Sequence, residues 1–100
     1  MQGRFSIEGN CSTMKTFPDK LDNAIVLEFS EFGNFGTIKG DNRTVRYFAI
    51  CQYPNDASYY LFFCAGYDYD FDVIIDDLGE TIEICKKIAA QYGDVVWHKK

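Results

Sequence analysis

The stretch that decides the fold is RTVRYFAICQYPNDASYYLFFCA, residues 43–65. Two runs rich in aromatic and β-branched residues, Arg43–Tyr53 and Ser58–Ala65, flank the turn sequence Pro54-Asn55-Asp56-Ala57. Runs of this composition on either side of a short turn are typical of antiparallel strands. The stretch therefore predicts a hairpin.

The turn also predicts the register of this hairpin. If Pro54 lies opposite Ala57, Cys51 faces Tyr60 rather than Cys64, which argues against a disulfide across the two strands. One face then carries Val45, Tyr47, Ala49, Cys51, Tyr60, Phe62 and Cys64, and the other Arg46, Phe48, Ile50, Gln52, Leu61 and Phe63. Both faces are largely apolar, so the hairpin is predicted to lie at the centre of a sheet.

Shorter strands are predicted around the hairpin from alternation and from turn residues. They are Arg4–Glu8, Asn23–Ser30, Phe35–Lys39 and Val95–Trp97, and the polar range Gly9–Asp22 is predicted to be a loop. Within the second of them we expect Ile25, Leu27 and Phe29 on one face, and Ala24, Val26, Glu28 and Ser30 on the other. The four cysteines are expected to be small buried core residues, although an even number leaves two disulfides open.

The last third of the chain predicts an acidic strand followed by a helix. Tyr67–Ile75 alternates apolar residues with aspartates, and a helix is expected to start at Asp76-Asp77. Asp77 with Glu80 has the form of a capping box, and Thr81 is the rival N-cap. One face of the helix carries Ile82, Cys85, Ile88, Ala89 and Tyr92.

These elements predict one α+β domain over residues 1–100, a mainly antiparallel meander sheet with one C-terminal amphipathic helix packed on one face. Met14 is a second candidate start codon, which would make residues 1–13 an extension.

Composition and charge exclude several functions. The net charge of −5 disfavours direct binding of nucleic acid. The single histidine, His98, and the absence of a Cys-x-x-C pair argue against metal sites, cofactors and most acid–base enzymes. The longest apolar runs are far shorter than the roughly 20 residues of a membrane helix. Residues 1–8 lack the apolar core of a signal peptide, so we expect a cytoplasmic protein.

The predicted acidic strand is the strongest candidate for a functional site. The stretch 47–85 holds eight acids and no Lys or Arg. Its carboxylates could be a solvated, salt-screened outer face, or a docking surface for basic side chains of another protein. Tyrosines beside the acids, including Tyr53 and Tyr59, would serve as interface anchors. The predicted partner-binding residues are Asp68, Asp70, Asp72, Asp76, Asp77, Tyr67 and Tyr69.

Two other interpretations of these acids fit less well. Asp68, Asp70 and Asp72 have the spacing of the first ligands of an EF-hand, but Val73 stands where the loop requires glycine. Paired carboxylates also serve glycosidases, but nothing else in the sequence indicates a sugar site.

About the last 40 residues resemble small bacterial immunity proteins of polymorphic-toxin and contact-dependent growth inhibition systems. The resemblance lies in an aromatic strand, an aspartate-rich strand and a helix of the form Thr-Ile-Glu-x-x-Lys-x-x-Ala-x-x-Tyr-Gly. Here these are Tyr59–Cys64, Tyr67–Asp77, and Thr81-Ile82-Glu83, Lys86, Ala89, Tyr92-Gly93, with Trp97 near the C-terminus.

The resemblance implies a cytoplasmic, non-enzymatic protein that binds a cognate toxin domain, often a basic nuclease, and blocks its active site. The alternatives are an acidic mimic of nucleic acid or another small binding module or subunit, and a small enzyme or ligand binder with a deep apolar pocket. The oligomeric state is left open.

Overall fold

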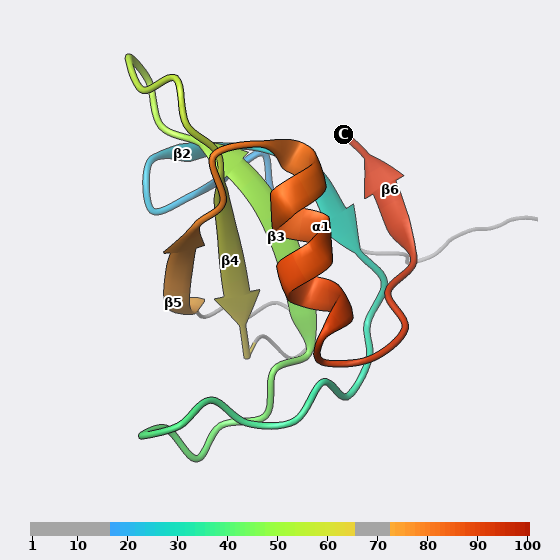
Figure 1. The fold of residues 1–100 in the computed structure, drawn as a ribbon. Coiled ribbons are helices and arrows are strands. Elements are labelled where there is room, and N and C mark those ends of the chain that lie inside the picture. The colour runs from blue at the N-terminus through green and yellow to red at the C-terminus, as the bar shows by residue number, and fades with distance from the viewer. Residues whose placement is uncertain (1–16, 66–72) are drawn as a thin grey trace, which may run out of the picture.

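The computed structural model describes residues 17–65 and 73–100. It contains one antiparallel sheet in the order β1-β2-β3-β4-β5, with β6 paired to β2 and one helix against the sheet (Figure 1). The predicted α+β fold, an antiparallel meander with a C-terminal helix on one face, is confirmed. The predicted strand Arg4–Glu8 and the extension 1–13 lie outside the described residues. The elements are β1 Lys20–Leu21, β2 Ala24–Ser30, β3 Tyr47–Gln52, β4 Tyr60–Cys64, β5 Val73–Leu78, α1 Ile82–Ala90 and β6 Trp97–Lys99.

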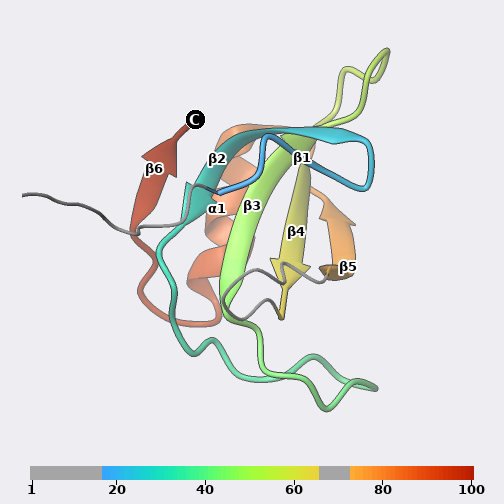
Figure 2. The same cartoon turned by 180° about the vertical axis from the view of Figure 1, so that it is seen from behind.

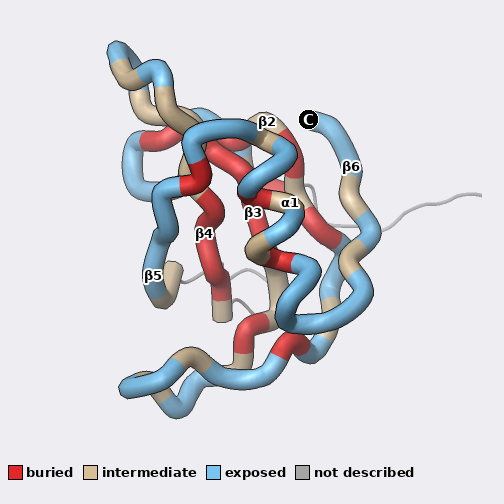
Figure 3. Tube along the Cα trace, in the orientation of Figure 1, coloured by how far each residue is buried: buried red, intermediate tan, exposed pale blue. Residues whose placement is uncertain are grey.

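The hairpin of β3 and β4 forms the centre of the sheet. Its register pairs Tyr47 with Cys64 and Cys51 with Tyr60, as the turn predicts. Asn55 adopts a left-handed backbone conformation with φ of 66°, which asparagine tolerates better than most residues. Figure 3 shows that the buried residues follow these two strands, whereas β5 is largely exposed.

Alternate residues of the hairpin build a core on each side of the sheet. On the helix side, Phe48, Ile50, Leu61 and Phe63 pack with Cys85 and Ala89 of α1. Figure 2 shows the opposite face, where β1 pairs with β2. The buried residues of that face are Phe17, Leu21, Ala24, Val26, Ala49, Cys51, Phe62 and Cys64.

A β-bulge in β2 changes which side of the sheet its residues face. Val26 pairs with Cys51, but Glu28 pairs with Ile50, so Leu27 is the additional residue. Glu28 therefore points toward the helix, where its carboxylate lies 2.9 Å from the Lys86 ammonium. Phe29 points to the other side and stacks on Phe17. The predicted uninterrupted alternation of Asn23–Ser30 is wrong after Val26 for this reason.

The segment before β3 is less regular than predicted. Phe35–Lys39 forms no strand, and only an isolated bridge joins Thr37 to Thr44. Phe35 is instead buried against Phe48, with ring centroids 4.7 Å apart, and its N–H donates to the Val45 carbonyl. Val45 packs in the helix-side core, contrary to the predicted face. The predicted loop Gly9–Asp22 includes the short strand β1.

The helix starts later than the pair Asp76-Asp77, which lies in β5. Asp77 is paired with Leu61 in the ladder, so it cannot cap a helix. Glu80 has a φ of 63°, incompatible with the first helical turn. Thr81, the rival candidate, is the N-cap, and its hydroxyl accepts a hydrogen bond from the Ile84 N–H at 3.1 Å. The apolar face predicted for the helix is confirmed, with Cys85 and Ala89 buried.

Gly79 fixes the tight connection between β5 and α1. A Cβ atom at this position would overlap the Cys85 sulfur and press on the Cys85 backbone nitrogen. We expect Gly79→Ala to lower the free energy of unfolding by about 1–3 kcal/mol, measured by urea denaturation, because the buried neighbour cannot move aside. In the double variant with Cys85→Ala, the loss should be smaller than the sum of the two single losses. Additive losses would show that the sulfur is not the obstacle.

Candidate functional site

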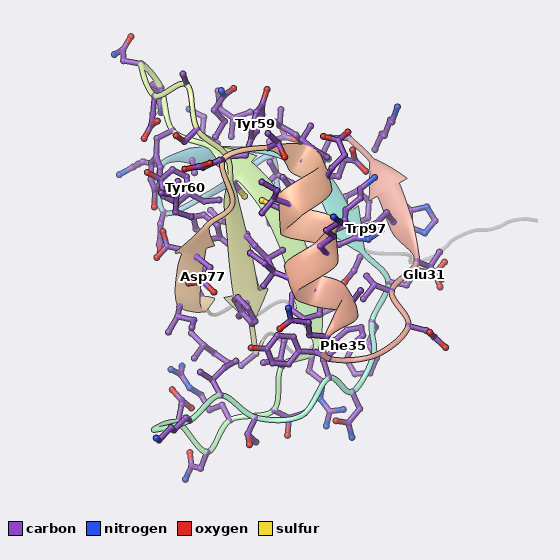
Figure 4. The ribbon with its side chains drawn as sticks, in the orientation of Figure 1. Glu31, Phe35, Tyr59, Tyr60, Asp77 and Trp97 are labelled. Atoms are coloured by element: carbon purple, nitrogen blue, oxygen red, sulfur yellow. The ribbon has the colours of Figure 1, made fainter. Side chains whose placement is uncertain are left out.

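The structure describes two of the seven residues predicted to bind a partner. Asp76 and Asp77 lie on β5, where Asp76 pairs with Phe62 and Asp77 with Leu61. Successive residues of a strand point to opposite faces, so Asp77 lies on the helix side (Figure 4) and Asp76 on the other. The remaining predicted residues, Tyr67, Asp68, Tyr69, Asp70 and Asp72, lie outside the described residues.

Asp76 belongs to a cluster of side chains at the turn end of the central hairpin. The Tyr53 hydroxyl lies 3.4 Å from Asp76 Oδ2, and the Tyr60 hydroxyl donates to Asp56 Oδ2 at 3.0 Å. The two tyrosine rings meet edge to face, with centroids 5.2 Å apart. We call Tyr53, Asp56, Tyr60 and Asp76 the tyrosine–aspartate patch.

The turn between β3 and β4 holds Asp56 in place within this patch. Its N–H donates to the Tyr53 carbonyl at 3.2 Å, and its Oδ1 accepts from the Ser58 N–H at 2.9 Å. The second carboxylate oxygen is thereby aimed at Tyr60. A carboxylate fixed by its own turn presents its charge in one position, which is the condition for a selective polar contact.

The surroundings of both phenols raise their pKa values above the ordinary value of tyrosine. Burial, followed by the charge of Asp76, raises the pKa of Tyr53 above its ordinary value. The hydrogen bond to Asp56, followed by burial, raises the pKa of Tyr60. A tyrosine is protonated at neutral pH even at its ordinary pKa, so both phenols act as donors and the negative charge of the patch resides on its carboxylates.

The charge of the patch is not neutralised by basic residues of the described chain. The salt bridges within residues 17–65 and 73–100 join Arg43 to Asp41, Lys86 to Glu28, His98 to Glu31 and Lys100 to Asp19. None of these involves Asp56 or Asp76. The carboxylate of Asp22 adds a further negative charge near Tyr53. A basic group from another molecule would thus meet a negative potential here.

Sequence reasoning identified part of this patch. Tyr53 is one of the predicted anchors, but Tyr59 packs against the helix-side core and is not in the patch. Tyr60 and Asp56 were missed. Tyr60 could have been found, because the predicted register of the hairpin already pairs it with Cys51 and so places it on the same face of the sheet as Tyr53.

The buried thiols of Cys51 and Cys85 are poorly suited to nucleophilic catalysis. Burial raises the pKa of Cys51 to about 12 and that of Cys85 to about 11, so both thiols stay protonated and are weak nucleophiles. Within residues 17–65 and 73–100, no group of three or more His, Cys, Asp or Glu side chains could hold a metal ion. The calcium interpretation of Asp68, Asp70 and Asp72 lies outside these ranges. No helix among the described residues is long and apolar enough to cross a membrane.

A hollow of about 190 Å³ lies between the loops that follow β2 and α1, and its wall includes Glu31 and Phe35, which are labelled in Figure 4. Its wall also includes Asp94 and the exposed side chains of Phe32 and Val96. This volume is below the usual range of small-molecule sites, about 300–1,000 Å³.

Comparison with family models, with curated proteins and with solved structures gives no match to this chain.

The Tyr60–Asp56 hydrogen bond predicts a shift in a measurable titration. We expect Asp56→Asn to lower the pKa of Tyr60, followed by the ultraviolet absorbance of tyrosinate, because the carboxylate no longer opposes ionisation. Asp94→Asn, a change outside the patch, should leave it unaltered.

The sign of the linked stability effect follows from the raised pKa. In the folded wild type, the hydrogen bond contributes stability below the ordinary tyrosine pKa and loses it as the pH rises through the raised value. Equal alkaline titration curves for wild type and Asp56→Asn would contradict the assigned bond.

Proposed function

We propose that this protein is a non-enzymatic, cytoplasmic inhibitor of the immunity-protein type, which binds a basic bacterial toxin domain through its acidic, aromatic surface. The observation that carries the proposal is the pair of carboxylates Asp56 and Asp76, held beside two tyrosines and paired with no basic side chain of the described chain. The resemblance of the C-terminal sequence to immunity proteins supports it.

The chemistry of the patch fits recognition of lysine and arginine. Carboxylates accept charge-assisted hydrogen bonds from ammonium and guanidinium groups, and arginine adds geometric specificity when both oxygens are engaged. Tyr53 and Tyr60 offer large, rigid surfaces at a low cost in conformational entropy, which is why tyrosine is frequent in binding sites. Such a surface favours tight binding of a protein rather than turnover of a substrate.

The net charge supports the same partner class. At −5 the chain attracts a basic protein at long range, and this attraction raises the association rate at low ionic strength. Toxins that cleave nucleic acid carry basic active-site surfaces, so an acidic inhibitor can occupy the place of the phosphate backbone. The inhibitor then acts by occlusion and needs no catalytic residue of its own.

The proposal is tested with the protein encoded beside this chain's gene. If a large toxin gene adjoins it, co-expression of the chain should restore growth to cells that express the toxin's C-terminal domain, and the purified pair should form a one-to-one complex. Failure to bind or protect would contradict the proposal. A neighbourhood of phage or restriction genes, with binding to one of their enzymes, would favour the alternative of a nucleic-acid mimic.

The patch makes a separate prediction for the rate of association. We expect the double variant Asp56→Asn, Asp76→Asn to associate with the toxin domain about 10-fold more slowly at low salt, and to show a weaker dependence on salt, because electrostatic steering is reduced. Stopped-flow fluorescence measures both. Asp94→Asn removes one charge elsewhere and serves as the control.

A companion variant with Asp68, Asp70 and Asp72 changed to Asn tests the residues predicted from the sequence alone. If both variants bind at the wild-type rate, the toxin-binding surface lies elsewhere on the chain.

A further inference from the structure

The strand β5 is the last strand of the described sheet and pairs only with β4. Its final four residues are all exposed, including the apolar side chains of Ile75 at 39% and Leu78 at 53%. Natural proteins usually cover or interrupt such an edge, because its free backbone groups can pair with another chain. Figure 1 shows β5 at the side of the sheet opposite to β6.

The hydrogen-bond pattern shows which backbone groups of β5 face outward. The Gly79 N–H donates to the Tyr59 carbonyl at 2.9 Å, so this pair is of the hydrogen-bonded kind. In antiparallel strands the two kinds of pair alternate, so Asp77 and Ile75 also bond toward β4. The N–H and C=O groups of Asp76 and Leu78 therefore point away from β4, at the spacing that an added strand requires.

The side chains along this edge specify what an added strand should carry. Asp76 and Leu78 lie on one face, opposite Phe62 and Tyr60, whereas Ile75 and Asp77 lie on the helix side. Each face thus presents one carboxylate and one exposed apolar side chain. Cross-strand neighbours stabilise a sheet when their charges are opposite or both are apolar. The complementary segment has two adjacent basic residues between two apolar ones.

A second copy of this chain does not satisfy that requirement. Antiparallel pairing of two β5 edges must match residues whose backbone groups both face outward, so it places Asp76 opposite Leu78 of the other copy and Asp77 opposite the second Asp77. Like charges directly opposite each other destabilise the pair. The edge therefore favours a basic partner over self-association.

The opposite edge of the sheet has different chemistry. There the short strands β1, Lys20–Leu21, and β6, Trp97–Lys99, both pair with β2, and their exposed side chains are Lys20, His98 and Lys99. The lysines of this edge would repel the basic segment that β5 attracts.

We infer that the outer edge of β5 binds an extended segment of a basic partner protein, of the pattern apolar-basic-basic-apolar, as an additional strand of the sheet. This inference rests on the proposed function and specifies how one segment of the partner would bind. Main-chain hydrogen bonds to Asp76 and Leu78 would supply affinity, and the two carboxylates would select the charge. The tyrosine–aspartate patch adjoins this edge through Asp76.

A synthetic peptide tests the inference directly. The probe is a short peptide with Val-Lys-Lys-Val at its centre, added to the full chain and followed by amide hydrogen exchange in NMR spectra. We expect at least about 10-fold slower exchange at Asp76 and Leu78, whose amides gain a partner, and little change at Ile75 and Asp77. A Val-Glu-Glu-Val peptide should not bind. Protection at another strand, or none, would overturn the inference.

Two controls separate strand pairing from simple charge attraction. The same peptide with N-methylated backbone amides keeps its charge but cannot pair, so it should lose binding; equal binding would overturn the inference. In the protein, Leu78→Pro removes the outward N–H without removing a bond to β4, whereas Leu78→Ala keeps that N–H. We expect only the proline variant to lose protection at Asp76. If Leu78→Pro does not fold, the N-methylated peptide alone tests whether binding requires strand pairing.

The same variants distinguish this inference from the proposed function. If Leu78→Pro folds and protects cells from the toxin as well as the wild type does, the edge is not used, although the protein is still an inhibitor. If the peptide binds at β5 but the wild type neutralises no neighbouring toxin, the edge is a strand-binding site and the proposed function is wrong. Dimerisation of the chain alone through β5 would overturn the choice of a basic partner.

Discussion

The two-sided burial of the β3–β4 hairpin is the constraint on which the rest of this structure depends. Phe48, Ile50, Leu61 and Phe63 must be covered on one side, and Ala49, Cys51, Phe62 and Cys64 on the other. The helix α1 covers the first set, and the second is packed with Phe17, Leu21 and residues of β2. Burial of both apolar surfaces is favourable, so the hairpin lies in the middle of the sheet and the more exposed strand β5 lies at its edge.

This arrangement decides where recognition chemistry can lie. The end of the hairpin projects beyond the buried part of the strands, and there Tyr53, Asp56 and Tyr60 meet Asp76 of β5. The strands that lead to this region are buried, while the carboxylates lie toward the surface. This arrangement supports the proposed binding of a basic protein, since a preorganised site loses little conformational freedom on binding.

The candidate site could be predicted from the sequence only in part. The sequence shows an acidic stretch without Lys or Arg, and it shows tyrosines beside that stretch. The sequence does not show which carboxylate contacts which tyrosine, because Asp76 reaches Tyr53 only through the pairing of β5 with β4. The capping-box pattern of Asp77 and Glu80 misplaced the helix start, since local preference cannot reveal that Asp77 is held in a ladder by Leu61.

The sequence by itself determined the hairpin register, the class of the fold and the buried face of the helix, because turn chemistry and periodicity act between near neighbours. Only the tertiary structure decided the β-bulge that turns Glu28 toward Lys86, the burial of Phe35 and the position of β5 at the edge of the described sheet. These features depend on contacts between segments far apart in the chain, where the best packing of the whole core outweighs the preference of each segment.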